Sequence, residues 1–261
     1  MEIYVKNRKG KKIFCEVERA ADFGDRLPAV LIVHGFKGWS AQRHISAISN
    51  ALVARGFLTV RADLTGNPGK SYLDFADMTY AQELSDCEDV LDHILRLSQI
   101  DAARIGITGH SLGGMIAAEI AAKRGEIKSL VVLSAVYDFK FVVKRIFNKP
   151  FKQVQKDFRE KGASFVWSQG LHKELVIKQG FYQDVVLRTA ADFAPKIICP
   201  TLVVSSGNDE SVSQSHAGKY LKTLGSGVKK MEIVDGADHN YSGVSLNQVT
   251  GLVKEWFMQT L

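Results

Sequence analysis

One serine of the sequence stands in a setting that favours nucleophilic catalysis. Residues 109–113 read Gly-His-Ser-Leu-Gly, a G-x-S-x-G motif that follows the apolar run Arg104–Thr108 and precedes a helical pattern at Leu112–Lys123. This strand–turn–helix context predicts a sharp turn that holds Ser111 in a strained conformation, with glycines where a Cβ would collide with neighbouring chain. The alternative is a turn that only caps a helix. The context favours Ser111 as a nucleophile.

A serine hydroxyl needs a base and an orienting carboxylate, and the expected order along the chain is Ser, acid, His. Among seven histidines, His239 follows the apolar run Val228–Val234 and precedes the last helical pattern. Asp209 follows the run Pro200–Ser206. Because both residues come after strands of one sheet, we expect their side chains to meet Ser111 at the same sheet edge.

Other residues of the same types are weaker candidates. Asp235 and Asp238 are too close in sequence to His239 to orient its far ring nitrogen, and Glu210 is expected to point elsewhere. The other six histidines are predicted to be structural, with a substrate contact left open only for His172: His34, His44, His93, His110, His172 and His216.

Two backbone N–H groups are predicted to bind the oxyanion of such a reaction. Leu112 follows the nucleophile at the start of a helix, whose dipole favours negative charge. The second donor is expected in the loop after the apolar run Ala29–Val33, which reads His-Gly-Phe-Lys-Gly at residues 34–38. The N–H of Phe36 is our candidate, because Gly35 lets this loop pass close to the substrate oxygen.

Runs that are apolar throughout alternate with helical patterns, as in a sheet that is covered on both faces. The predicted strands are Glu2–Val5, Phe14–Val17, Ala29–Val33, Phe57–Ala62, Arg104–Thr108, Ile127–Leu133, Pro200–Ser206 and Val228–Val234. The predicted helices are Ala41–Arg55, Asp77–Ser98, Leu112–Lys123, Ser213–Leu224 and Val244–Met258. This order predicts an α/β fold with a mostly parallel eight-stranded sheet between two layers of helices.

One segment interrupts the alternation. Residues 139–195 contain no convincing strand pattern and are too long for an ordinary loop, so we expect a helical lid or cap. The core of the fold is then expected in two parts, at residues 1–138 and 196–261.

The positive charge and many aromatic residues gather in this segment. Residues 139–178 hold ten Lys or Arg and three acids, a balance of +7, which leaves −1 for the rest of a chain whose net charge is +6. The aromatics could form an apolar acyl or aryl pocket with a basic rim, and the alternatives are simple packing on the core or docking to a membrane surface. The predicted substrate contacts are Phe36, Lys37, Trp39, Phe139 and Trp167.

Composition excludes several other classes of protein. With 46% hydrophobic and 24% charged residues, the chain of 261 residues is neither disordered, collagen-like nor a coiled coil. No signal peptide, membrane span or nucleic-acid motif is recognisable, so a cytoplasmic protein without nucleic-acid partners or stable membrane insertion is expected. Three cysteines without metal-ligand spacing predict free thiols, and no metal or organic cofactor is expected. A homodimer is left open.

Four motifs together resemble the serine-hydrolase branch of the α/β-hydrolase superfamily: His34-Gly-Phe, Gly109-His-Ser-Leu-Gly-Gly114, Gly207-Asn-Asp209 and Gly236-Ala-Asp-His239. The resemblance spans about residues 29–261 outside the lid. The 34–38 loop, residues 61–66 and the helix at 77–92 are most similar to small carboxylesterases of the cinnamoyl (feruloyl) esterase type. The sequence departs from them at Asn67-Pro68, where relatives usually have His-Gly.

The sequence therefore predicts a serine carboxylesterase that hydrolyses small acyl or aryl esters through an acyl-enzyme intermediate. Its small-molecule substrate would need only the triad Ser111, His239 and Asp209 and the backbone donors of Phe36 and Leu112. An acyl-peptide or aminopeptidase-like hydrolase, a thioesterase and a noncatalytic binding protein on the same fold stay open as alternatives.

Overall fold

A mixed sheet of eight strands forms the centre of the protein, in the order β1-β2-β4-β3-β5-β6-β9-β10. The computed structural model describes residues 1–21, 24 and 26–261. Strand β2 pairs antiparallel with β1 and β4, and the other neighbours in the sheet are parallel. The strands are β1 (Glu2–Lys6), β2 (Lys12–Glu18), β3 (Leu27–Val33), β4 (Leu58–Asp63), β5 (Ile100–His110), β6 (Ile127–Leu133), β9 (Thr201–Ser206) and β10 (Lys229–Val234). The predicted mostly parallel sheet is confirmed.

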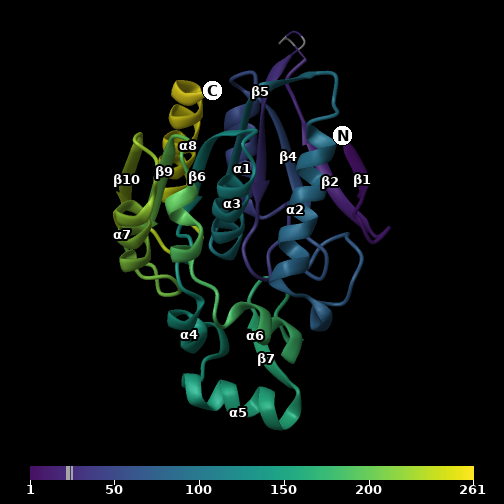
Figure 1. Cartoon of the computed structure of the whole chain (residues 1–261), viewed down its shortest axis with the longest axis vertical. Helices are drawn as coiled ribbons and strands as arrows, with labels where there is room; N and C mark the ends of the chain where they lie inside the picture. Colours follow the sequence, from purple (N-terminus) through teal and green to yellow (C-terminus); the bar gives the residue numbers. More distant parts are fainter. Residues whose placement is uncertain (22–23, 25) are drawn as a thin grey trace.

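Helices cover both faces of this sheet (Figure 1). They are α1 (Arg43–Val53), α2 (Tyr80–Ile94), α3 (Leu112–Lys123), α7 (Gln214–Thr223) and α8 (Ser245–Thr260). Buried side chains of α1 and α8 pack on one face, and those of α2, α3 and α7 pack on the other. Among the described residues, no helix is both long and apolar enough to cross a membrane.

Strand β3 illustrates why the central strands are apolar throughout. All seven of its residues are buried. Ala29, Leu31 and Val33 belong to the core layer beneath α2 and α3, whereas Val30 and Ile32 belong to the layer beneath α1 and α8. Because successive side chains of a strand point to opposite faces, two buried faces leave no position for a polar residue.

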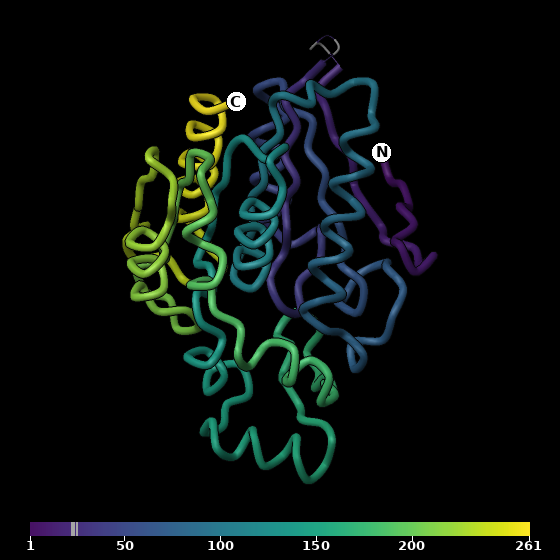
Figure 2. The backbone as a smooth tube through the Cα atoms, in the orientation of Figure 1, coloured from purple at the N-terminus to yellow at the C-terminus, as the bar shows by residue number. Residues whose placement is uncertain are grey.

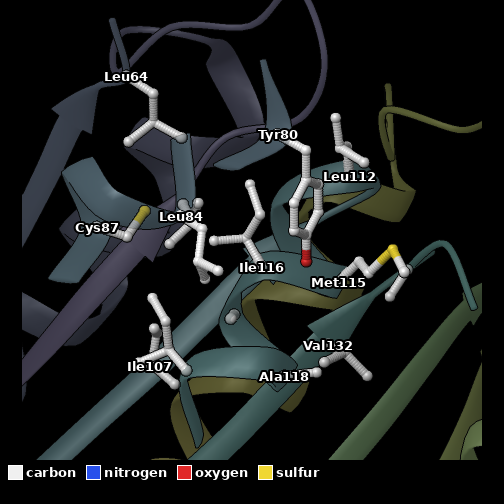
Figure 3. Close-up of a cluster of buried hydrophobic side chains, with 14 of the residues drawn as sticks. Leu64, Tyr80, Leu84, Cys87, Ile107, Leu112, Met115, Ile116, Ala118 and Val132 are labelled. Atoms are coloured by element: carbon white, nitrogen blue, oxygen red, sulfur yellow. The ribbon is translucent and has the colours of Figure 1, made fainter. Parts of the chain in front are cut away.

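The core layer on the α2 and α3 side includes Leu112, the first residue of α3 (Figure 3). Leu84 and Cys87 of α2, Ile116 of α3 and Ile107 of β5 belong to this cluster, and all four side chains are buried. This packing fixes the start of α3, and therefore the turn before it, against the sheet.

Helix α2 starts later than its sequence pattern predicts. A short 3-10 helix, η1 (Phe75–Asp77), precedes it, and Thr79 is the N-cap, with its side-chain oxygen accepting the N–H of Gln82 at 3.1 Å. Threonine is a preferred N-cap because its hydroxyl satisfies an N–H that has no partner in the first turn. The helix therefore begins at Tyr80.

Residues 139–195 leave the sheet after β6, return to it before β9, and lie at the end of the molecule opposite the C-terminus (Figures 1 and 2). We refer to this segment as the lid. It contains η2 (Phe139–Phe141), α4 (Val143–Phe147), α5 (Phe151–Lys161), β7 (Ala163–Ser168), β8 (Lys173–Lys178), α6 (Gln179–Val185) and η3 (Ala190–Asp192), and η4 (Ala194–Lys196) follows.

The prediction of a helical lid without strands was wrong at one place, because β7 and β8 form an antiparallel hairpin. Strand β7 alternates regularly between buried Val166 and exposed Phe165 and Trp167. Its exposed face is aromatic rather than polar, so the usual alternation of apolar and polar residues is hidden in the sequence.

The three cysteines are all buried inside this fold. Cys15, Cys87 and Cys199 are unpaired thiols, as the sequence predicts. Burial raises the pKa of each thiol above its ordinary value.

Candidate active site

Ser111 occupies the tight turn between β5 and α3 with a backbone conformation that is rare for a side-chain-bearing residue, φ 57° and ψ −119°. A Cβ on Gly109 would lie 2.1 Å from the carbonyl oxygen of Gly113, and a Cβ on Gly113 would lie 2.1 Å from that of His34. Both glycines are therefore required for the turn to close, as predicted. Such strain is typical of functional sites and needs a rigid surrounding structure.

Three loops at the carboxyl edge of the sheet bring Ser111, His239 and Asp209 into one line of contacts. The Nε2 atom of His239 lies 3.0 Å from Ser111 Oγ, and its Nδ1 lies 2.8 Å from Asp209 Oδ2. A carboxylate can only accept, so Nδ1 carries the proton and Nε2 is free to accept from the serine hydroxyl. The structure thus brings together all three residues that the sequence singled out.

Asp209 is held in place by more than its contact with His239. Its side chain is 1% exposed, and its second oxygen accepts the backbone N–H groups of Ser211 and Val212, each at 2.8 Å. Burial acts to raise the pKa of Asp209, but the hydrogen bond and charge of His239 and the two N–H groups outweigh it, so the pKa lies below its ordinary value. The carboxylate is therefore ionised and fixed.

The loop of His239 is supported by a second histidine. His110 donates from Nε2 to the carbonyl oxygen of His239 at 2.7 Å, and the two rings lie 4.6 Å apart. Burial, followed by the nearby His44 and His239, lowers the pKa of His110 well below its ordinary value. A neutral His110 thus positions the His239 backbone and does not face the serine, as predicted.

His34 also has the supporting role that was expected of it. Its Nδ1 donates to the carbonyl oxygen of Gly35 at 2.9 Å, and its Nε2 accepts the N–H of Leu64 at 3.0 Å. The imidazole therefore joins the loop after β3 to the loop after β4.

The two predicted oxyanion donors lie beside Ser111, on the loop after β3 and at the first residue of α3. Neither the N–H of Phe36 nor that of Leu112 has a hydrogen-bond acceptor among the residues that the structure describes. The first N–H groups of a helix have no partner inside it, so that of Leu112 is free by geometry. Both groups are available to a negatively charged oxygen.

A cavity of about 560 Å³ opens at Ser111 and His239 between the core and the lid. Its walls include four of the predicted substrate contacts, Phe36, Lys37, Phe139 and Trp167. The other lining residues are Leu112, Val136, Val142, Arg145, Ile146, Phe147, Asn148, Lys149, Phe165, Glu174, Ser211 and Val212. The walls combine apolar side chains with polar and charged ones, and of the charged residues Arg145, Lys149 and Glu174 belong to the lid.

Trp39 is the one predicted substrate contact that the structure does not bring to this cavity. Trp39 lines a separate pocket together with His44 and Tyr241. Its ring packs against Gly170 so closely that a Cβ added to this glycine would lie 2.7 Å from the nearest ring atom. The loop after β3 brings the Trp39 ring next to Gly170, between β7 and β8 of the lid.

Sequence reasoning missed part of the cavity wall. Val136 and Val212 were not singled out, although each follows a strand whose carboxyl end reaches the site. That position was the available signal, since loops after parallel strands converge on one edge.

The lid and the core are joined directly by residues that line the cavity. Lys37 Nζ donates to the carbonyl oxygen of Trp167 at 2.8 Å, and burial lowers the pKa of this ammonium group. The ring of Phe36 stacks on Phe181 of α6 with centroids 5.0 Å apart. The loop after β3 therefore contacts both Ser111 and the lid.

Comparison with known proteins finds a matching family and a relative of similar sequence. The family model of the alpha/beta hydrolase family matches residues 30–248. A 31.7 kDa protein of Escherichia coli from the traX–finO intergenic region is 27% identical over 264 positions, covering 90% of this chain and 91% of the relative.

Two solved structures are also similar. Est1E from Butyrivibrio proteoclasticus with bound ferulic acid matches with a TM-score of 0.85 and 25% identity, over 99% of this chain and 98% of that one. The esterase domain of a Rhodothermus marinus protein matches in fold with a TM-score of 0.74 and 19% identity, over 99% and 98% of the two chains.

Proposed function

Because the chain belongs to the alpha/beta hydrolase family, we propose that it is a serine carboxylesterase for small acyl or aryl esters. The observation that carries this proposal is the line of contacts from Ser111 Oγ through His239 to Asp209, in which Ser111 and His239 line the cavity. A serine, an imidazole and a carboxylate in this order activate the hydroxyl for attack on an acyl carbon.

The first half of the proposed reaction forms an acyl-enzyme. His239 Nε2 takes the proton of Ser111 as Oγ attacks the ester carbonyl, and Asp209 stabilises the imidazolium that results. The N–H groups of Phe36 and Leu112 bind the oxyanion of the tetrahedral intermediate. His239 then gives its proton to the leaving alkoxide, which departs as the alcohol.

The second half repeats the same proton transfers with water. His239 deprotonates a water molecule that attacks the acyl carbon, and the collapsing intermediate expels Ser111 Oγ, which recovers the proton. The acid leaves, and the protein returns to its starting state.

The shape and lining of the cavity support the proposed substrate class. A volume of about 560 Å³ with walls such as Phe139, Ile146 and Phe147 suits a compact apolar acyl or aryl group. The similarity to Est1E, which binds ferulic acid, favours an aromatic acid as one such group.

The proposal is tested by labelling with a fluorophosphonate probe, which reacts with an activated serine. We expect wild-type protein to label and Ser111→Ala to lose labelling and ester turnover together. Ser215→Ala, which removes an exposed hydroxyl from α7, is the matched control and labels like wild type. Wild-type protein that does not label would leave only a noncatalytic binding protein on this fold.

The substrate bond is tested with matched ester, thioester and anilide substrates of one acyl group. Turnover of the ester is expected to exceed that of the other two. Equal or faster anilide turnover would favour a peptidase-like hydrolase, and faster thioester turnover would favour a thioesterase. A cytoplasmic location and a homodimer stay predictions.

A further inference from the structure

The loop that carries the Phe36 N–H is attached to a buried polar chain that the proposed chemistry does not use. The backbone N–H of Lys37 donates to Asn67 Oδ1 at 3.0 Å, and Asn67 Nδ2 donates to Glu83 Oε1. A backbone N–H can only donate, so the Asn67 oxygen must face Lys37 and its NH₂ group must face Glu83. The chain of bonds therefore has one direction, from the loop after β3 to α2.

Glu83, in the first turn of α2, is almost fully buried, with 1% of the residue exposed. Its Oε1 accepts from Asn67, whereas Oε2 has no hydrogen-bond partner among the described residues. Burial raises the pKa of Glu83 to about 8, with the hydrogen bond from Asn67 acting against this and the nearby Asp86 and Asp184 acting with it. Burial of a carboxyl group lowers the stability of the folded protein, and an apolar residue of similar size in the same place would not carry this desolvation penalty.

The loop itself needs to be held. Lys37 has a φ of 62°, in the left-handed region that side-chain-bearing residues avoid. The ring of Phe36 is fixed on one side by Phe75 and Phe181, at centroid distances of 5.5 and 5.0 Å. The hydrogen bond from Lys37 N–H to Asn67 holds the peptide between Phe36 and Lys37, so both the side chain and the backbone of Phe36 are fixed.

We propose that Asn67 and Glu83 are positioning residues that hold the Phe36 N–H in the direction of the oxyanion. This inference rests on the proposed esterase function. An oxyanion donor is effective only when it is already oriented before the charge develops, because reorientation during the reaction would consume the stabilisation. The strained loop, the aromatic contacts and the polar chain from α2 together supply that orientation.

The first test is Asn67→Ala, measured by ester kinetics on folded protein. Complete loss of one oxyanion donor costs ~10²–10³ in turnover, and we expect a misdirected donor to lower kcat at least about tenfold with KM within about threefold of wild type. Binding of a trifluoromethyl ketone, which forms a tetrahedral adduct with serine, should weaken by the same factor as kcat/KM. Binding of the product acid should not change.

Glu83 provides the second test and the rescue. Glu83→Leu removes the acceptor of Asn67 and is expected to lower kcat as Asn67→Ala does, whereas Glu83→Gln keeps an acceptor oxygen and should retain wild-type kcat. Because both residues act through one chain of bonds, the double variant N67A/E83L should be no worse than N67A alone. Tyr80→Phe, which removes a buried hydrogen bond from α2 to Glu119, is the control: it lowers stability and leaves kcat unchanged.

The possible outcomes separate this inference from the function on which it rests. Wild-type protein without ester turnover overturns both. Active wild-type protein with an unchanged kcat in folded N67A overturns only the positioning role, and so does a rise in KM at constant kcat. If N67A does not fold, E83L decides in the same way, and failure of both variants to fold would overturn a role limited to positioning.

Discussion

The carboxyl edge of the sheet and the lid face the same cavity but are built in opposite ways. At the sheet edge Asp209 is fixed by His239 and two backbone N–H groups, and the His239 ring is fixed between Asp209 and Ser111. On the lid, Phe165 and Trp167 line the cavity with 50% and 55% of their surfaces exposed. The comparison teaches that the core fixes the geometry of the candidate triad by hydrogen bonds, whereas the hairpin of the lid adds half-exposed aromatic side chains to the cavity wall.

The strongest test of this contrast is Asp209→Asn at the core side. An amide in place of the carboxylate favours the wrong tautomer of His239, and we expect kcat to fall about 10⁴-fold while the fold is retained. Steady-state kinetics and a thermal melt measure the two effects. Glu210→Gln, at the adjacent exposed acid, is the matched control with wild-type kcat. Equal losses in both variants would mean that Asp209 is not the orienting carboxylate.

A second change tests whether the core edge is as rigid as its contacts indicate. In Gly113→Ala the new Cβ would meet the His34 backbone at 2.1 Å, where no side chain can move aside. We expect a loss of about 3 kcal/mol or more in the free energy of unfolding, or no folded protein. Gly125→Ala has no atom within 4 Å of its Cβ and should change stability little. Urea denaturation compares the two, and similar stabilities would show that the turn can relax.

The free energy of unfolding is expected to depend on pH in opposite directions for the buried histidines and for the buried Glu83. Burial is the largest cause that lowers the pKa of both His44 and His216 to about 4, so the unfolded chain takes up protons first as the pH falls. The contribution of these histidines to the free energy of unfolding is complete above about pH 6.5. It falls by about 1.4 kcal/mol per pH unit for each histidine as the pH drops from there to about 4.

Urea denaturation between pH 4 and 7.5 measures this loss, and His216→Gln should make the slope shallower. Glu83 acts in the opposite direction, because its pKa in the folded protein is raised. Its contribution to the free energy of unfolding is complete below about pH 4.5 and is lost as the pH rises through about 8. A slope that His216→Gln leaves unaltered would contradict the assignment to buried histidines.

The smallest effect is expected on the lid. Trp167→Ala removes an exposed aromatic wall, so we expect kcat/KM for aryl esters to fall about three- to tenfold with short acyl esters affected less and the melting temperature unchanged. Leu187→Ala, an equally apolar lid residue that is 87% exposed and away from the cavity, is the control. A large loss of stability in Trp167→Ala would make the lid a rigid part of the fold and end the contrast.

The sequence predicted the core far better than the lid, and the reason is physical. Strands such as β3 are buried on both faces, and the turn at Ser111 admits only glycine at two positions, so the local sequence is tightly constrained there. In the lid, the hairpin of β7 and β8 carries aromatic residues on its exposed face, which removes the signal for a strand.

The candidate site shows the same division. Ser111, His239 and Asp209 follow strands, so topology alone predicts that they meet. Trp39 follows a strand as well, but five residues of loop beyond the end of β3 at Val33 leave its direction undetermined by sequence. The bonds of Asn67 join three segments far apart in the chain, and a single sequence contains no signal for such a connection.

The three buried thiols allow local unfolding of the protein to be measured without an added label. Cys15 lies in β2, next to the edge strand β1, Cys87 lies in α2 and Cys199 just before β9, so each samples a different part of the molecule. A thiol reagent reacts with the exposed thiolate, which burial suppresses at all three positions. The rate of alkylation at each cysteine would therefore read out, without any added label, which part of the fold opens first.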